Sequence, residues 1–404
     1  MARILFTWEL GGGMGHILPY ASIFKALESK GHELVFILKD LRRVNLIRGI
    51  VNAVCFQAPL KSWRDINTIK LPLTYSHILH NMAFADSTSA FGLIEGWRAL
   101  FNQIKPELVV FEHSPTALLA ARGFSFQKIL IGTGFTIPPP VYPLPNLRFW
   151  VKTDEALLKK QEDRTLGIMN ALLGHYQATR LDRISDLFAS ETQVLKTFRE
   201  LDPYPERMDG NYYGSWIYPA GEEPLWPEGE GKKAFVYLAP FSTLPSLLSA
   251  LIKLEIPSLV YIEGIGLKLK DKFNSPALRF VDKPQNMTKV AEQCDFGILN
   301  GTMNTTTNLL LAGKPALHLP LFLEQTLTAH NIEKLGAGLS TPTLRPEDME
   351  AQLRRLISSD DFTQAAQKFA DRYAALNAQK QNQWLLDQIE RRLMTETGES
   401  LSYV

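Results

Sequence analysis

Short runs of hydrophobic residues alternate with amphipathic stretches along the first half of the chain. Uninterrupted apolar runs predict buried strands at residues 3–8, 33–38, 108–111 and 128–131. Apolar residues at helical spacing predict helices over residues 16–30, within 76–104, and in the stretch that ends at Arg122. Because strand and helix alternate, the N-terminal half is predicted to be a doubly wound parallel sheet.

The same alternation starts again after a segment rich in proline and glycine at 202–231. The second set of strands is predicted at residues 234–238, 258–262, 279–281, 295–299 and 316–319. The tail from about residue 346 is helical, and we expect its apolar stripe to brace the domains; the stripe consists of Trp384, Leu385, Leu386, Ile389 and Leu393. Two further segments are interpreted as a constrained Pro-rich loop at 138–145, which could be a substrate-facing lid, and a long solvated helix within 151–190.

The fold class predicted from this pattern is α/β, with two Rossmann-like domains. We expect an N-terminal domain over residues 1–205, a linker at 206–231, a C-terminal domain at 232–380 and a final helix at 381–404 that packs back on the first domain. The chain has 404 residues, of which 45% are hydrophobic, and this is enough to form two cores.

Charge and cysteine content exclude several classes of protein. Lysine plus arginine number 43 against 42 acidic residues, so no charge excess favours nucleic acid or anionic lipid. Only two cysteines, Cys55 and Cys294, are present, which argues against a disulfide framework and suits the cytoplasm. No apolar run is long enough for an integral membrane segment. The oligomeric state is left open, with a homodimer as one option.

A glycine-rich stretch, Gly11-Gly12-Gly13-Met14-Gly15-His16, lies between the first predicted strand and helix. It does not match the dinucleotide-binding fingerprint, whose third glycine position is occupied by His16. At the first turn of a helix, the dipole would favour the neutral imidazole of His16, which can act as a base. Glu112 ends a strand at the same sheet edge and could orient that imidazole, and His113 is a second candidate of lower rank. Alternatively, His16 only caps the helix and Glu112 is an independent loop carboxylate.

A second candidate site follows the predicted strand 295–299. Asn300-Gly301-Thr302-Met303-Asn304-Thr305-Thr306 opens a helix, whose free amides and small hydroxyl residues can hold a phosphate. The alternative is ordinary helix capping by Asn, Thr and Gly. On residue types alone, both interpretations stay open.

Taken together, these motifs resemble the nucleotide-sugar glycosyltransferases of the two-Rossmann GT-B type, in particular the UDP-glycosyltransferases that modify antibiotics, sterols and other natural products. The resemblance rests on Gly15-His16-Ile17-Leu18-Pro19 and on Gly301 to Thr306, Gly313-Lys314-Pro315, Pro320, Glu324-Gln325, Asn331 and Gly336-Ala337-Gly338. It implies two domains that face a cleft, with the acceptor bound by the first domain and the donor by the second. The implied activity is that of a hexosyltransferase that uses a UDP-sugar or dTDP-sugar as co-substrate, with inversion and without a metal or another cofactor. The implied acceptor is a hydroxyl of a small or lipid-like molecule.

The resemblance also implies a role for each site residue. His16 would be the general base, Glu112 would stand where the family usually has aspartate, and Gly15 would belong to the same loop. The donor diphosphate, ribose and sugar would contact Gly15, Asn300, Gly301, Thr302, Asn304, Thr305, Asn308, Glu324 and Gln325.

Three positions depart from the family pattern. Asn300 replaces a histidine that donates to the diphosphate, Asn308 replaces a glutamate common at the ribose, and Pro240 offers no amide in the loop Ala239-Pro240-Phe241-Ser242. These departures keep two alternatives open. One is a non-catalytic relative that binds a nucleotide and activates a partner, and the other is a sugar-nucleotide 2-epimerase.

Overall fold

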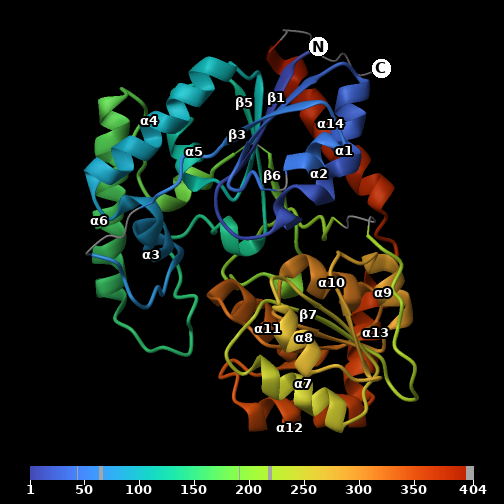
Figure 1. Ribbon diagram of the computed structural model, residues 1–404. Coiled ribbons are helices and arrows are strands. Elements are labelled where there is room, and N and C mark those ends of the chain that lie inside the picture. Colours follow the sequence, from blue (N-terminus) through green and yellow to red (C-terminus); the bar gives the residue numbers. More distant parts are fainter. Residues whose placement is uncertain (43, 63–66, 191, 217–220, 397–404) are drawn as a thin grey trace. The chain divides into compact units, whose positions relative to one another are not determined.

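Two parallel six-stranded sheets form the framework of the protein in the computed structural model (Figure 1). The structure describes residues 1–42, 44–62, 67–190, 192–216 and 221–396. One compact unit contains residues 1–196, 204–214 and 378–404, and the other contains residues 197–203 and 215–377. The prediction of two Rossmann-like domains is confirmed. The division into an acceptor domain, a linker at 206–231 and a donor domain stays a prediction.

The first sheet has the strand order β3-β2-β1-β4-β5-β6, and its strands are paired in parallel. Its strands are β1 (Arg3–Trp8), β2 (Glu33–Leu38), β3 (Ala53–Gln57), β4 (Leu108–Glu112), β5 (Gln127–Gly132) and β6 (Gln193–Leu195). The chain leaves β1 toward β2 on one side and later returns to β4 on the other. The carboxyl ends of β1 and β4 therefore form the switch point at which open α/β sheets bind ligands.

Helices cover both faces of this sheet. Figure 1 shows α4, α5 and α6 on one side and α1, α2 and α14 on the other. The α-helices of this unit are α1 (Ala21–Ser29), α2 (Val44–Arg48), α3 (Tyr75–Leu79), α4 (Ser87–Ile104), α5 (Pro115–Ala120), α6 (Glu155–His175) and α14 (Ala378–Glu396). Shorter turns are the 3-10 segments Met14–His16, Leu18–Tyr20, Gly134–Thr136 and Ile184–Phe188, and the π-helical segment His80–Phe84.

Three predicted helices differ in the structure. The helix expected over 16–30 begins only at Ala21, because Pro19 interrupts the segment and two 3-10 turns precede the α-helix. His16 therefore ends a short 3-10 turn, and the expected placement on the first turn of an α-helix is wrong. The 76–104 pattern is divided among α3, the π-helical segment and α4. The 151–190 segment is α-helical only over α6, which buries one face, including Leu158 and Met169.

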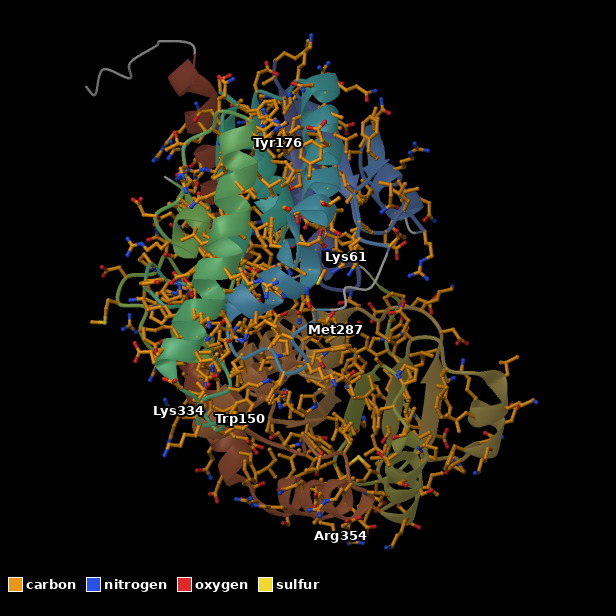
Figure 2. All side chains as sticks on the ribbon, turned by 90° about the vertical axis from the view of Figure 1, so that its left-hand side faces the viewer. Lys61, Trp150, Tyr176, Met287, Lys334 and Arg354 are labelled. Carbon is orange, nitrogen blue, oxygen red and sulfur yellow. The ribbon has the colours of Figure 1, made fainter. Side chains whose placement is uncertain are left out.

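Aromatic contacts join α6 to α4. Tyr176, labelled in Figure 2, follows the end of α6 and donates a hydrogen bond to Glu95 of α4 over 2.6 Å. The Arg98 guanidinium lies 4.3 Å from the centre of the Tyr176 ring, and Phe91 stacks on the same ring. This contact holds the long helix against the domain even though most of its outer face is polar.

The C-terminal helix α14 packs on the first unit, against α1 and the strands β4 and β5. Leu385, Leu386 and Ile389 of its apolar stripe are buried. Trp384 stacks on Tyr213 with ring centres 3.6 Å apart, which fixes the start of the helix to a segment far back in the chain.

The second sheet has the order β12-β11-β10-β7-β8-β9 and is also paired in parallel. Its strands are β7 (Ala234–Leu238), β8 (Ser258–Ile262), β9 (Leu278–Val281), β10 (Phe296–Leu299), β11 (Ala316–His318) and β12 (Gly338–Ser340). The helices are α7 (Leu244–Lys253), α8 (Leu267–Lys272), α9 (Met287–Gln293), α10 (Met303–Leu311), α11 (Leu323–Lys334), α12 (Pro346–Ser358) and α13 (Asp361–Arg372), with a 3-10 turn at Arg199–Leu201.

Apolar clusters fill both sides of the second sheet. Leucines of α7 and α12 pack with β7, β8 and β10 on one side, while α9 and α10 cover the other. A further cluster joins α10, α11 and α13 to Phe198 and Leu201. None of the helices in the described part of the chain combines the length and the apolar character needed to cross a membrane.

Candidate active site

The carboxyl edge of the first sheet carries the first group of candidate residues. Trp8 at the end of β1 lies in register with Glu112 at the end of β4, so the glycine-rich loop after β1 starts beside that carboxylate. His16 Nδ1 lies 2.5 Å from Glu112 Oε2. The structure thus brings together the histidine and the carboxylate that the sequence placed at one edge. Gly15 is exposed in the 3-10 turn that ends at His16.

The ring of His16 is held on two sides. It stacks on Trp8 with ring centres 5.3 Å apart, and its Nε2 lies over Gly11. A Cβ at Gly11 would come within 2.3 Å of that Nε2, and Gly11 has a φ of +85°. Glycine is therefore required at this position both for the backbone conformation and for the close approach of the imidazole.

Glu112 is buried and ionised because His16 and the Lys196 ammonium group flank it. Its side chain is 4% exposed, with His16 at Oε2 and the Lys196 ammonium group at Oε1. Burial acts to raise the pKa of Glu112, but its interactions with His16 and Lys196 outweigh burial and lower the pKa to about 2. The carboxylate therefore carries its charge at neutral pH and accepts a hydrogen bond from His16 Nδ1, which leaves Nε2 as the basic nitrogen.

Lys196 is a residue that the sequence analysis missed. It follows β6, a three-residue edge strand that the hydrophobic pattern did not reveal. Its backbone N–H donates to Gly132 O of β5 over 2.8 Å, which places its side chain at the same sheet edge. The available signal was a lysine directly after the apolar pair Val194-Leu195.

His113 lies beside His16, with ring centres 6.0 Å apart. If strand geometry continued through His113, its ring would point away from the side chain of Glu112. The strand ends at Glu112, however, and His113 has a φ of +42°. Burial lowers the pKa of His113 to about 3, so its imidazole is neutral. Neither ring nitrogen has a hydrogen-bond partner among the described residues.

The second group of candidates lies at the carboxyl edge of the second sheet, in the other unit. After β10 the chain passes through Asn300 and Gly301 and enters α10 with Thr302 as its N-cap residue. The Thr302 side chain is exposed and makes no capping hydrogen bond to the first-turn amides of α10. Such amides, with the helix dipole, favour an anion.

Asn300 is a structural link between two loops. Its Oδ1 accepts a hydrogen bond from Ala239 N over 2.6 Å, and its Nδ2 donates to Leu319 O over 2.8 Å. The loop after β7 therefore has no backbone N–H to offer a ligand at Pro240, and the backbone N–H of Ala239 is already bonded to Asn300. Gly301 has a φ of +94°, and a Cβ there would approach Gln325 O to 2.8 Å. This glycine allows the start of α10 to lie against the start of α11.

The remaining donor candidates differ in their surroundings. Asn304 is half-buried, while Thr305 and Asn308 are buried. The hydroxyl of Thr306 lies 3.3 Å from Nε2 of the buried His318 and therefore faces inward. At the start of α11, Glu324 is partly exposed in the first turn, and the Gln325 side chain accepts a hydrogen bond from Leu321 N.

In the part of the chain that the structure describes, no three His, Cys, Asp or Glu side chains gather so that they could hold a metal ion. The described residues thus place a histidine paired with a buried carboxylate at the carboxyl edge of the first sheet, and the start of a helix without a side-chain cap at the carboxyl edge of the second.

No protein-family model matches the chain. It is 32% identical over 400 residues to a PGL/p-HBAD biosynthesis glycosyltransferase of Mycobacterium tuberculosis, an alignment that covers 92% of this chain and 88% of the relative. The calicheamicin glycosyltransferase CalG4 superposes with a TM-score of 0.70 at 15% identity, covering 97% of this chain and 98% of that protein. The glycosyltransferase VinC, solved in complex with dTDP, gives 0.64 at 18% identity, with coverage of 97% and 100%.

Proposed function

The chain belongs to the GT-B nucleotide-sugar glycosyltransferases, and from this we propose that it is an inverting, metal-independent enzyme that transfers a sugar from a dTDP-sugar or UDP-sugar to an acceptor hydroxyl. The observation that carries the proposal is the short contact between His16 Nδ1 and the buried carboxylate of Glu112. That contact leaves the opposite ring nitrogen, Nε2, free to take a proton.

The proposed reaction is a single displacement. His16 Nε2 removes the proton from the acceptor hydroxyl while its oxygen attacks the anomeric carbon of the donor. The bond between that carbon and the diphosphate oxygen breaks, and the nucleoside diphosphate leaves with the electron pair. One attack from the face opposite the leaving group inverts the anomeric centre. Glu112 stabilises the imidazolium that forms.

The leaving group would be held by the second domain. The first-turn amides of α10, with Thr302, Asn304 and Thr305, are proposed to bind the diphosphate and to stabilise its growing negative charge. Glu324 and Gln325 are proposed to contact the sugar, and Asn308 the ribose. Because Asn300 Oδ1 already accepts from Ala239 N and Nδ2 already donates one N–H to Leu319 O, this residue would support the cradle and offer the diphosphate at most one N–H.

Support for the donor class comes from the solved neighbour VinC, which carries dTDP. The M. tuberculosis relative is named for PGL/p-HBAD biosynthesis, and we propose by analogy that the acceptor here is a hydroxyl of a small or lipid-like molecule. The non-catalytic and epimerase alternatives are not favoured by glycosyltransferase relatives.

The first test is a thermal-shift screen with dTDP, UDP and GDP, followed by measurement of nucleotide release from the matching sugars with and without a chelator. A nucleotide that binds only the folded state raises the melting temperature. We expect dTDP or UDP to raise it and EDTA to leave transfer unchanged. Failure of all three nucleotides to shift melting would contradict the proposal.

The second test is substitution of the base. We expect His16→Ala to lower kcat/KM by about 10²-fold to 10⁴-fold, which is the typical contribution of a general base. His175→Ala, at the end of α6 and in contact with Phe91, is the matched control and should transfer normally. Product analysis should show an inverted glycoside rather than an epimerised donor.

A further inference from the structure

The buried carboxylate of Glu112 is shared between two cationic partners that come from different parts of the chain. Oε2 lies against His16, and Oε1 forms an ion pair with Lys196. The Lys196 side chain is 5% exposed, so both members of the ion pair are withdrawn from water. Its ammonium group also lies 5.8 Å from the centre of the Tyr20 ring.

A buried ion pair needs a structural or functional reason, because taking two charges out of water is unfavourable. Among the described residues, the Lys196 ammonium group contacts Glu112 and lies near the ring of Tyr20. With Lys196 in place, Glu112 can face His16 only through Oε2, which aligns this oxygen with Nδ1 of the imidazole.

We propose that Lys196 is a positioning residue of the glycosyltransfer reaction, whose ammonium group balances the charge of Glu112 so that the carboxylate orients His16 without drawing a proton onto its imidazole. This inference rests on the proposed role of His16 as the base. A histidine beside an isolated buried carboxylate would gain a proton more readily, because the imidazolium would then be the only positive charge available to neutralise it.

The charges around His16 support this assignment to Lys196. Among the described residues, the titratable side chains beside the imidazole, its carboxylate or its loop are Glu112, His113, Lys196, Tyr20 and Lys39, and Glu9 interacts with Lys39. His113 and Tyr20 are neutral, since burial lowers the pKa of the first and raises that of the second.

Two of these groups are engaged elsewhere. The Lys39 ammonium group donates to the carbonyl oxygen of Gly11. Glu9 accepts hydrogen bonds from Thr116 and from the Ala117 N–H at the start of α5. Lys196 is thus the cation in direct contact with the carboxylate that orients His16.

The experiment is an NMR titration of the full chain labelled with ¹³C-histidine. The His16 resonance is identified by its absence in His16→Gln. Lys196→Met removes the ammonium group, Lys196→Gln removes the charge but keeps a hydrogen-bond donor, and Lys196→Arg keeps the charge. The Gln variant provides the test should the Met variant not fold.

We expect the titration midpoint of His16 to rise by about one pH unit in the Met and Gln variants, the size of effect that one close charge has. The Arg variant should stay near the wild type. The matched control is Lys128→Met, which removes a half-buried lysine of β5 that donates to Ala121 O. It should not move the midpoint.

Unchanged midpoints in both uncharged variants would overturn the inference, as would equal shifts in the Gln and Arg variants. A loss of stability without a shift would mean that the ion pair is only structural, and this also overturns it. The proposed function is judged separately. If His16→Ala is still active, the proposed function is overturned and with it the role of Lys196. If His16→Ala is inactive but the His16 midpoint is unchanged in the Lys196 variants, only the present inference is overturned.

Discussion

The imidazole of His16 lies so close to the backbone of Gly11 that a single methyl group there would displace it. A Cβ at Gly11 would approach His16 Nε2 to 2.3 Å, whereas a Cβ at Gly13 meets nothing within 4 Å. Both glycines have a positive φ, +85° and +76°. The two positions share the same backbone strain and differ in the contact with the proposed base.

We therefore predict that Gly11→Ala and Gly13→Ala each reduce the free energy of unfolding by about 1 kcal/mol, the usual cost of alanine at positive φ. Only Gly11→Ala should also strongly reduce transfer, because the ring must move. Urea unfolding and initial rates at saturating donor measure the two effects. Equal loss of activity in both variants would show that loop strain alone matters.

Asn300 shows how one amide can connect two loops. Its side chain pairs the backbone N–H of Ala239 and the carbonyl of Leu319. We predict that Asn300→Ala lowers the free energy of unfolding by about 2 kcal/mol or more, since two backbone groups lose their partner. Thr302→Ala, which removes no capping bond, should change stability by less than about 0.5 kcal/mol. Denaturant unfolding of the two variants decides this.

At the scale of elements, the Pro-rich loop is attached to α6 through a buried carboxylate. Glu162 of α6 is fully buried and accepts a hydrogen bond from Leu144 N over 2.7 Å. Burial raises the pKa of Glu162 to about 7. Between about pH 4.5 and pH 7 the folded chain therefore keeps a proton that the unfolded chain has released, and the free energy of unfolding falls as pH rises through this window.

The prediction is that Glu162→Gln flattens this pH dependence and is more stable than the wild type at pH 8. The gain in the free energy of unfolding is at most about 3 kcal/mol, which is the free-energy equivalent of the raised pKa of Glu162. Glutamine can still accept from Leu144 N but carries no buried charge. Chemical unfolding at pH 5 and pH 8 provides the measurement, and a stability difference that does not depend on pH would contradict the expected cause.

The elements themselves were predicted unevenly. Every strand predicted from an apolar run is present with its ends within one residue. All of these strands except β9 lie inside a parallel sheet, where strands are buried on both faces. The strands that were missed, β3, β6 and β12, are all edge strands. β3 carries half-exposed residues, and β6 and β12 have only three residues each, so none of them produces a long apolar run.

At the scale of the whole molecule, the chain returns to its first unit through α14. Ile389 of this helix is completely buried against that unit. We predict that Ile389→Ala lowers the stability of the first unit by about 2 to 5 kcal/mol, the range for deleting a buried aliphatic side chain. The second unit should keep its melting temperature and its affinity for dTDP.

Calorimetry with and without dTDP can separate the two units, because the nucleotide is proposed to bind only the second. Leu393→Ala, on the same helix but only partly buried, is the control and should have a smaller effect. If Ile389→Ala weakens dTDP binding by as much free energy as it takes from the stability of the first unit, the two units do not unfold independently.

Local pattern was enough to determine much of this protein. The apolar runs specified two parallel α/β sheets, and the order of His16, Glu112 and the Asn300-Gly301-Thr302 turn placed the candidate residues at strand ends, since those positions follow from chain order and periodicity alone. Tertiary structure decided which side chains meet. Lys196 reached Glu112 only because β6 pairs with β5 at that edge, and His113 turned toward His16 because of one positive φ. Partners of this kind depend on strand neighbours and on single backbone angles, which no local pattern of hydrophobic and polar residues records.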